Sequence, residues 1–600
     1  MHNFALKYIQ TIFFLPVLAT VWIVDSGLPN GAVTGKYFWF YGAMVVISTI
    51  VFVSCLIERK KFRSIRQDFF VFLFCVSGLV LTWVHNRSIS NKWVILLLVL
   101  PLYFCFRYTM QENRKSRYLM LFFLLFTGLF EALWGLGQLY GLYNSYHNLY
   151  PVTGSFFNPG PYAGYLSIVA PIAIFYCVFD GRVFQRKLKI RYWPFYLRGG
   201  LSILTIASIL VILPSTMSRA AWIAFVSGII WVFVFYYRRK RKTKKYFNLT
   251  GWKRKYIFIF MVCLLLAGMY YMKKDSADGR FLIWKVSAHI ITHHPFGVGL
   301  DNFSGNYGER QSAYFATGAG SAQERYVAGS PDYGFNEFIQ IGVEHGIHGL
   351  LLFITILFLA IYMGIKKKRF AETGSLVALL VFSTMSYPFS VLPFLIVLVF
   401  LLASCATDMK TEVLEKSVSR YVTVTIFGIF LAITFAGSYS RIATYQAFKK
   451  MNTSLALKIG GLSNEVLSLY AEIYPELKYE THFVFDYATI LKDDGQYAES
   501  NRVLKQGMKI SCDPAFYNLT GINHQLMKDN AAAEIYFRKA ADMVPNRLYP
   551  YYLLAKLYLE MGLFDKACQM AEIVLTKEPK VYSQAVIDMR KEMEKIMIND

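Results

Sequence analysis

Charged residues are scarce in this 600-residue chain, since Lys, Arg, Asp and Glu together make up only 17% of it. With 55% of the residues hydrophobic, this scarcity excludes an ordinary soluble protein and indicates a membrane protein with many spans. The eight cysteines lack C-x-x-C spacing, so neither a zinc knuckle nor a redox pair is indicated. The first apolar segment lacks a cleavage site of the A-x-A kind, and we expect it to be an uncleaved span.

The net charge of +25 would suit a nucleic-acid binder if the basic residues were spread over a soluble surface. They are instead clustered beside apolar segments, as the positive-inside bias of membrane proteins predicts. We therefore expect the lipid bilayer, and no nucleic acid, among the partners of this chain.

Apolar runs long enough to cross a hydrocarbon core of about 30 Å recur along the first 437 residues. The pairs 199–237 and 372–404 could each be a hairpin or one long helix. The sequence predicts an all-α protein with about thirteen spans, near 5–24, 38–57, 69–85, 92–107, 118–139, 160–180, 199–215, 219–237, 255–272, 335–364, 372–387, 389–404 and 421–437.

Basic loops predict the orientation of these spans. Lys and Arg cluster after the second, fourth, sixth, eighth and tenth spans, whereas the loop at 140–159 has none. The bias therefore places the N-terminus in the cytoplasm, and the 140–159 loop, the 273–334 loop and everything after Ser438 on the opposite side. We expect a transmembrane domain over 1–437 and a separate domain over 438–600.

The segment after Ser438 is polar, helical and repetitive. YATILKDDGQYAESNRVLKQG is echoed by YLLAKLYLEMGLFDKACQMAE, with Gly495 and Gly562 at equivalent places and a weaker copy between them. Pro514, Pro545 and Pro579 follow the second helices. This pattern resembles tetratricopeptide repeats, in which stacked helix pairs bury a continuous core. An unrelated helical bundle is the alternative.

Two arginines at the outer side are candidate anion ligands. Arg219 begins a span where the positive-inside bias disfavours arginine, and Arg280 opens the long loop. A guanidinium matches phosphate with a rigid fork of donors, and a helix N-terminus also favours anions. The ordinary alternatives are a snorkelling side chain for Arg219 and a plain loop charge for Arg280.

Polar residues near the 140–159 loop are candidates for shaping the site. Gln138 ends the fifth predicted span, and Asn158 lies in GSFFNPGP, whose glycines and prolines would break the next span and admit a ligand to the backbone. A simple turn before the span is the alternative. His293 and His294 have no third ligand at metal spacing, so we predict no metal site.

These motifs together resemble the O-antigen ligase superfamily, which includes O-antigen polymerases and protein O-oligosaccharyltransferases. The resemblance covers roughly 120–405 and rests on GSFFNPGPYAGY, SRAAW, HPFGVGLDNF and FNEFIQIGVEHGIHG in this order. It implies a bacterial inner-membrane enzyme with a periplasmic tail. The enzyme would move a glycan from undecaprenyl diphosphate to lipid A core, a growing polysaccharide or a protein hydroxyl, without cofactor or metal. Arg219 and Arg280 match the family's diphosphate ligands, and the tail would bind a protein partner.

One departure from the family concerns the general base. The family pattern places histidine before Asn336, but this chain has Phe335, which accepts no proton. Asp332 and Glu337 are the nearest carboxylates, and we prefer Asp332 as the base; an ordinary turn residue is the alternative for Asp332. Glu344 would orient the acceptor, and Asn336 would shape the site. A reaction without a general base is a further alternative, because the diphosphate is a good leaving group.

Two other classes of function compete with a glycosyltransferase. A transporter or flippase for lipid-linked glycans needs polar residues deep in several spans, and the sequence offers few intramembrane charges beyond Glu131. A membrane-anchored repeat scaffold for envelope glycan assembly would not need about thirteen spans. The transferase is therefore the preferred hypothesis.

Overall fold

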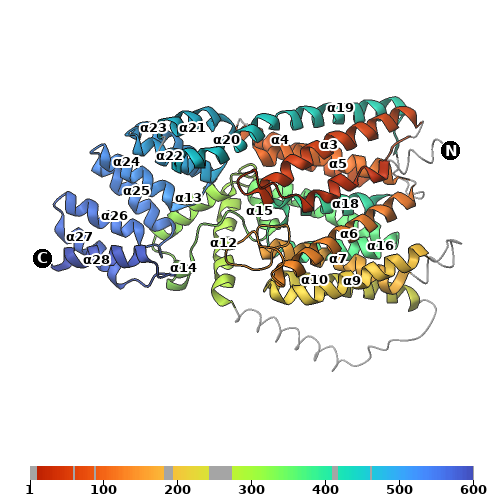
Figure 1. The fold of residues 1–600 in the computed structure, drawn as a ribbon, viewed down its shortest axis with the longest axis horizontal. Helices are drawn as coiled ribbons and strands as arrows, with labels where there is room; N and C mark the ends of the chain where they lie inside the picture. Colours follow the sequence, from red (N-terminus) through yellow and green to blue (C-terminus); the bar gives the residue numbers. More distant parts are fainter. Residues whose placement is uncertain are drawn as a thin grey trace, which may run out of the picture. The chain divides into compact units, whose positions relative to one another are not determined.

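The chain is all-α, as predicted (Figure 1). The computed structural model describes residues 10–58, 61–86, 90–111, 113–180, 193–241, 273–407, 416–459 and 463–598. Within these ranges the β structure is limited to β1 (Arg63–Ser64) and β2 (Lys416–Ser417), which pair antiparallel. All other regular secondary structure in these ranges is helical.

Two compact units make up the chain, and each takes residues from several parts of the sequence. Among the described residues, the first unit holds 10–241, Phe335–Phe338 and His348–Tyr445. The second unit holds 273–334, Ile339–Ile347 and the chain from Gln446 onward. The long loop after the ninth predicted span therefore shares a unit with the tail, while the extent of the two predicted domains stays a prediction.

The first unit is a bundle of apolar helices (Figure 1). Its elements are α2 (Leu15–Leu18), η1 (Ala19–Trp22), α3 (Gly31–Ile57), α4 (Arg66–Asn86), α5 (Asn91–Met110), α6 (Arg114–Leu139), α7 (Pro159–Phe175), η2 (Tyr176–Asp180), α9 (Trp193–Ser215), α10 (Arg219–Arg241), α17 (Phe370–Ser383), η3 (Pro388–Ser390), α18 (Leu392–Ala406) and α19 (Arg420–Tyr439), and most of α16 (Gly346–Lys366) belongs to it as well.

The apolar helices are those of a multi-pass membrane protein. Within the described ranges, nine helices are long and apolar enough to cross a membrane, and Gln10–Trp22, Phe370–Ser383 and Leu392–Ala406 are shorter apolar helices. Both ambiguous pairs, 199–237 and 372–404, are two separate helices. The predicted span at 255–272 lies outside the described residues, and the number of thirteen spans stays a prediction.

The tenth predicted span begins later than expected. Its first part is a separate helix, α15 (Glu337–Glu344), and α16 starts at Gly346. Gly346 has a φ of +71°, a left-handed conformation that ends a right-handed helix. The residues from 335 to 345 therefore precede the span, and the carboxylates predicted there lie on a short helix of their own.

Three helices of the first unit approach one another closely through glycines. A Cβ atom on Gly228 of α10 would lie 3.0 Å from the carbonyl oxygen of Gly374 on α17 and 2.7 Å from Pro171 of α7. Small residues allow such close packing of membrane helices, where dispersion contacts replace the hydrophobic effect. This packing fixes the axis of α10, which begins with Arg219.

Buried charges are more numerous than the sequence indicated. Besides Glu131, the first unit buries Lys36, an ion pair between Arg107 and Asp68 (2.9 Å), and an ion pair between Arg117 and Glu372. The patterns missed the two ion pairs because their partners lie on different helices, far apart in sequence. In each of these two pairs the opposite charges neutralise each other inside the bundle.

The long loop of the second unit is mostly helical, although the sequence suggested a mixed-charge loop. It forms α12 (Lys274–His293), α13 (Phe303–Ala316) and α14 (Ala322–Val327). Arg280 consequently lies inside a helix and not at the mouth of an irregular loop. A buried apolar cluster of this unit includes Leu282, Val286, Tyr307 and, from the tail, Cys512.

The tail consists of stacked helix pairs, as the repeats predicted. After α20 (Arg441–Ile459) and α21 (Ser463–Leu477) come α22 (Thr481–Asp493), α23 (Tyr497–Ile510), α24 (Pro514–Leu526), α25 (Asn530–Met543), α26 (Tyr549–Glu560), α27 (Phe564–Thr576) and α28 (Gln584–Ile598). Gly495 and Gly562 take positive φ at the turns between paired helices. In the weaker copy Lys528 takes the same conformation, which explains why its sequence is harder to recognise.

Candidate functional site

Arg219 is the first residue of α10 and is half-buried. Two hydrogen bonds hold this end of the helix: Ser167 Oγ donates to the carbonyl oxygen of Ala221 at 2.9 Å, and Trp222 Nε1 donates to that of Leu213 at 2.9 Å. Met217, just before the helix, has a φ of +50°. The guanidinium and the helix N-terminus thus sit together in one fixed turn, an arrangement that favours an anion.

Gln138 fixes the 140–158 loop in the first unit. Its Oε1 accepts from the backbone N–H groups of Thr153 (2.9 Å) and Gly154 (2.7 Å), and its Nε2 donates to the Gly154 carbonyl oxygen at 3.1 Å. Gly154 has a φ of +54°, and a Cβ there would lie 2.5 Å from Glu131 Oε2. Gln138 therefore holds the backbone of the loop, and its site-shaping role stays a prediction.

Lys36 is a buried residue that the sequence reasoning did not single out. Its Nζ donates to the carbonyl oxygens of Val21 (2.6 Å), Ile23 (2.8 Å) and Ser155 (3.0 Å), while Glu131 Oε2 accepts from the Ser155 backbone N–H at 3.1 Å. A lone lysine close to the start of the predicted span 38–57 was the available signal. Lys36 and Glu131 together hold the loop at Ser155.

Asn158 and Asn336 both cap helices. Asn158 Oδ1 accepts from the backbone N–H of Gly160 at 2.9 Å, at the start of α7. Asn336 Oδ1 accepts from the N–H of Phe338 at 3.0 Å, at the start of α15. Such caps satisfy the first free N–H groups of a helix, so each residue fixes the backbone at the start of its helix. Their site-shaping role stays a prediction.

The position of the family's histidine is held by Phe335 in a strained conformation. Phe335 has a φ of +47° and packs its ring edge-on against Tyr387 at 5.4 Å. A left-handed conformation in a bulky residue costs free energy and persists only where surrounding contacts enforce it. The turn at Phe335 is thus enforced by its surroundings, and the side chain on it accepts no proton.

Glu337 is buried and hydrogen-bonded to backbone. Only 2% of its surface is exposed, and its Oε1 accepts from the N–H of Phe389 in η3 at 2.5 Å. Asp332, by contrast, is exposed. The two carboxylates therefore differ in exposure: Asp332 is accessible to solvent, whereas Glu337 is not.

The segment 327–334 runs along α12 in the second unit. A Cβ on Gly279 would lie 3.7 Å from the carbonyl oxygen of Val327, and Trp284 Nε1 donates to the Gly334 carbonyl oxygen at 3.1 Å. Arg280 precedes Trp284 by one helical turn, so both lie on the same face of α12. Trp284 thus ties the face of α12 that carries Arg280 to Gly334, two residues after Asp332.

Glu344 lies near the end of α15, only 6% exposed, and its Oε1 accepts from Gln340 Nε2 at 3.5 Å. Its carbonyl oxygen accepts from the N–H of Gly299 at 2.9 Å. A Cβ on Gly297 would lie 2.5 Å from the backbone nitrogen of Gly346. The two motifs HPFGVG and VEHG are therefore packed backbone to backbone, which explains their glycines.

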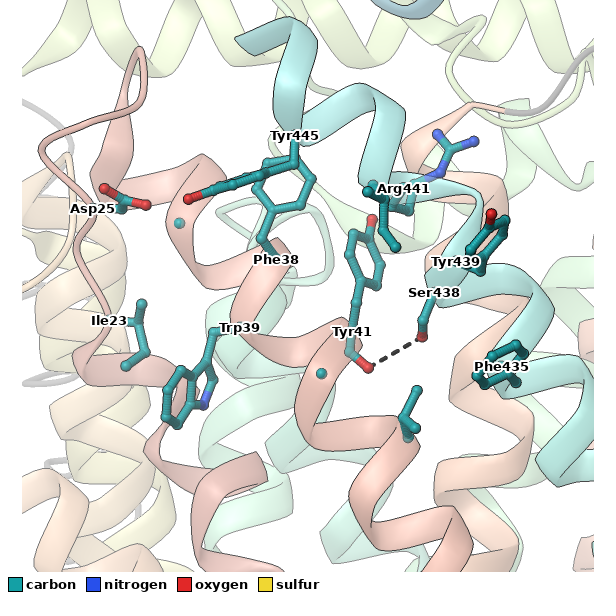
Figure 2. Close-up of a pocket in the computed structure, with 14 residues that line it drawn as sticks. Ile23, Asp25, Phe38, Trp39, Tyr41, Phe435, Ser438, Tyr439, Arg441 and Tyr445 are labelled. Atoms are coloured by element: carbon teal, nitrogen blue, oxygen red, sulfur yellow. Dashed lines mark hydrogen bonds between the residues drawn. The ribbon is translucent and has the colours of Figure 1, made fainter. Parts of the chain in front are cut away.

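A separate hollow of about 510 Å³ lies between α3 and α19 in the first unit (Figure 2). Six of its fourteen lining residues are aromatic: Phe38, Trp39, Tyr41, Phe435, Tyr439 and Tyr445. Figure 1 draws α3 and α19 along one edge of this bundle and α9 and α10 along the opposite edge. None of the predicted site residues lines this hollow.

The described residues contain no group of three or more His, Cys, Asp or Glu side chains placed to hold a metal ion. His293 Nδ1 faces the carbonyl oxygen of His289 at 2.8 Å, and its Nε2 lies 3.3 Å from Arg310 Nη2. His293 thus completes local contacts on its own helix and with α13.

Part of the chain is similar to a known protein family. Residues 201–354 match the family model described as O-antigen ligase. The matched segment contains Arg219, Arg280, Asp332, Asn336, Glu337 and Glu344. No curated protein matches the chain.

Several solved helical-repeat proteins resemble the chain weakly. The MamA protein is 16% identical over 26% of this chain and 88% of its own, with a TM-score of 0.21. A thermophilic tetratricopeptide-repeat protein of Thermus thermophilus is 16% identical over 30% of this chain and 95% of its own, with a TM-score of 0.22. The Cut9–Hcn1 hetero-tetramer of APC/C is 10% identical over 93% of this chain and 90% of its own, with a TM-score of 0.21.

Proposed function

We propose that this protein is a membrane glycosyltransferase of the O-antigen ligase type. It moves a glycan from undecaprenyl diphosphate to an acceptor hydroxyl at the periplasmic face of the bacterial inner membrane. The observation that carries this proposal is the family match over 201–354, because that segment contains both candidate arginines and both candidate carboxylates. The acceptor is lipid A core, a growing polysaccharide end or a protein hydroxyl.

The proposed reaction is one displacement at the anomeric carbon of the donor sugar. The acceptor oxygen forms a bond to that carbon, and the bond from the carbon to the diphosphate oxygen breaks. The electron pair of the broken bond leaves with undecaprenyl diphosphate, and the acceptor proton passes to the base. No oxidant, nucleotide or metal ion enters this balance.

In this proposal Arg219 and Arg280 bind the diphosphate and stabilise the charge that develops on it. Positioned donors lower the barrier most where negative charge grows in the transition state. Arg219 adds the N-terminus of α10, which is supported by the hydrogen bonds of Ser167 and Trp222. The lipid tail of the donor stays in the membrane, which restricts its orientation.

Asp332 is the proposed general base. It is exposed, and it lies on the segment that runs along the Arg280 face of α12. Glu337, accepting from the Phe389 N–H, is the proposed support of the Phe335–Asn336 turn. Glu344 and Gln138 act indirectly, through α15 and the 140–158 loop respectively.

The decisive experiment is transfer in vitro. The purified full-length protein in nanodiscs would receive lipid-linked glycan and, in separate reactions, each of the three acceptor types. We expect release of undecaprenyl diphosphate together with a glycosylated product for one acceptor. Movement of a fluorescent lipid-linked glycan across the bilayer of vesicles, without transfer to any acceptor, would instead favour the flippase function.

The orientation is testable independently. We expect a cysteine introduced at exposed Lys566, in a variant with Cys568→Ser, to react with an impermeant maleimide once the outer membrane alone is permeabilised. Labelling only after lysis of the inner membrane would place the tail in the cytoplasm. That result would contradict the proposed periplasmic reaction.

A further inference from the structure

We propose that the repeat tail is an internal positioning element for the reaction: it holds the 325–331 segment and thereby places Asp332. This inference rests on the proposed function for the role of Asp332. The positioning residues are Asn546, Arg547 and Lys580, which we name the tail clamp. The ligand of this part of the tail is the protein's own loop.

The first argument is a shared core within the second unit. Cys512, which lies between α23 and α24, is 1% exposed and belongs to the same apolar cluster as Phe303, Tyr307 and Val327 of the loop. Burying such side chains together stabilises the contact in proportion to the apolar area removed from water. The loop and the tail therefore fold as one body in this unit.

Glycines of α13 bring the backbones into contact. A Cβ on Gly305 would lie 2.1 Å from the carbonyl oxygen of Lys509, and one on Gly308 would lie 2.7 Å from the Cys512 Cβ. No side chain larger than hydrogen fits at either place without a shift of backbone. The sequence of α13 is thus fitted to the end of α23.

The second argument is the set of hydrogen bonds to the 325–331 segment. Asn546 Nδ2 lies within 3.3 Å of the Arg325 carbonyl oxygen, 2.8 Å of that of Tyr326 and 2.6 Å of that of Ala328. Lys580 Nζ donates to the Ala328 carbonyl oxygen as well, at 3.1 Å. One amide just after the end of α25 thus binds the C-terminal turn of α14.

The bonds continue toward Asp332. Gln311 Nε2 links the carbonyl oxygens of Gly329 (2.8 Å) and Met543 (2.6 Å), and Arg547 Nη2 donates to Ser330 Oγ at 3.4 Å. The Pro331 carbonyl oxygen accepts from Ser304 Oγ and from Cys512 Sγ, each at 3.3 Å. Loop and tail donors together therefore hold successive residues up to the one before Asp332.

The far side of Asp332 is held separately. Gly334 accepts through its carbonyl oxygen from Trp284 and donates its N–H to Gln340 Oε1 at 3.1 Å. Asp332 thus lies on a short exposed bend between Pro331, which is tied to the tail, and Gly334, which is tied to α12 and α15. A base must be held within hydrogen-bond reach of the proton it accepts, so loosening either anchor would misplace it.

The main test uses Asn546→Asp in the full-length protein in nanodiscs. This substitution keeps the shape of the side chain but replaces the amide donor with oxygen atoms facing three carbonyl oxygens. We expect amide hydrogen exchange in 328–334 to accelerate at least tenfold, and kcat for transfer to fall at least tenfold with little change in the KM of the donor. A role confined to overall stability would instead accelerate exchange across α22–α27 together.

A milder variant covers the case in which Asn546→Asp fails to fold. Arg547→Ala removes a half-exposed side chain that bonds Asp513 at 3.0 Å and Ser330. Arg502→Ala is the matched control, because Arg502 also forms an exposed ion pair in the tail, but with Glu499 of its own helix, α23. We expect faster exchange in 328–334 and slower transfer for Arg547→Ala only.

Two results would overturn the inference. Unchanged exchange in 328–334 for both clamp variants would show that the tail does not hold the segment, and faster exchange with wild-type transfer would remove the positioning role. Absence of transfer by the wild-type protein is a different outcome, since it contradicts the proposed function. The exchange measurement would still decide whether the tail holds the segment.

Discussion

Trp284 and Gly334 are joined by a hydrogen bond from the indole Nε1 to the carbonyl oxygen, 3.1 Å long, between α12 and the segment that carries Asp332. The bond links residues 50 positions apart in the sequence. Because Arg280 lies one turn before Trp284, this bond sets the face of α12 that meets the segment. The bond thus ties the helix of the proposed anion ligand to the segment of the proposed base.

Trp284→Phe should weaken transfer while the protein still inserts into the membrane. The variant keeps an aromatic ring but leaves the Gly334 carbonyl oxygen without its indole donor, at a cost of about 1–3 kcal/mol where that oxygen is shielded from water. We expect a fall in kcat, measured with purified protein. Trp93→Phe is the control, because Trp93 Nε1 donates to the Leu79 carbonyl oxygen at 3.1 Å in the first unit. Equal losses in both variants would contradict a local effect.

Arg219→Lys and Arg280→Lys should each reduce transfer about 10- to 100-fold. Lysine keeps the charge but loses the planar fork that binds two phosphate oxygens. Expression and membrane insertion should persist, since neither change removes a charge. The measurement is the transfer rate at saturating acceptor, with Arg310→Lys on α13 as the control. Normal glycan chains in cells carrying either variant would rule out the diphosphate ligand role.

Asp332→Asn should affect the rate of transfer, whereas Glu337→Gln should affect mainly the stability of the protein. Loss of a general base typically costs 10²–10⁴-fold in rate, so Asp332→Asn should slow transfer by about that factor and change its pH profile. Glu337→Gln should mainly lower thermal stability, because its Oε1 contact to the Phe389 N–H weakens when the acceptor is neutral. A double variant with the wild-type rate and pH profile would exclude both carboxylates as the general base. Phe335→His in the Asp332→Asn background tests whether position 335 faces the acceptor.

Acid should destabilise the second unit through Glu324. Partial burial raises the pKa of this carboxyl, but hydrogen bonds from Lys285, the Ser321 N–H and Tyr314 outweigh burial and lower the pKa to about 2. Since the folded pKa lies below the unfolded value of about 4.3, this contribution is present above pH 4.3 and is lost as the pH falls toward 2. Hydrogen exchange of α14 at several pH values measures it.

Lys285→Met is the informative variant for this pH dependence. Without the ammonium that lies 2.7 Å from Glu324 Oε1, the pKa of Glu324 should move back toward its ordinary value, and the loss of protection between pH 4.3 and 2 should become smaller. Glu309→Gln is a suitable control, because Glu309 is an exposed acid on α13. An unchanged acid response in Lys285→Met would show that this pair is not its source.

Local patterns predicted most of the helices, because apolar runs and repeat glycines such as Gly495 report on a few neighbouring residues at a time. They missed the helix around Arg280, since its mixed charge lacks a long apolar stripe, and they joined α15 to α16, since Gly346 is one glycine in an apolar run. They could not predict that Glu337 is buried and Asp332 is exposed. The burial of Glu337 depends on its contact with η3, which lies far along the chain. The contact between Asn546 and Ala328 spans 218 residues and has no local signal.

The distance along the chain between the 325–331 segment and the tail clamp has a consequence for biosynthesis. The loop is translated before the residues that hold it, and the last of these contacts, from Lys580 to Ala328, spans 252 residues. A nascent or truncated chain ending before the final repeats would carry every proposed chemical group but lack the donors that fix the segment. Full transfer activity would then arise only when synthesis is nearly complete, so unfinished chains in the membrane would consume the lipid-linked glycan more slowly.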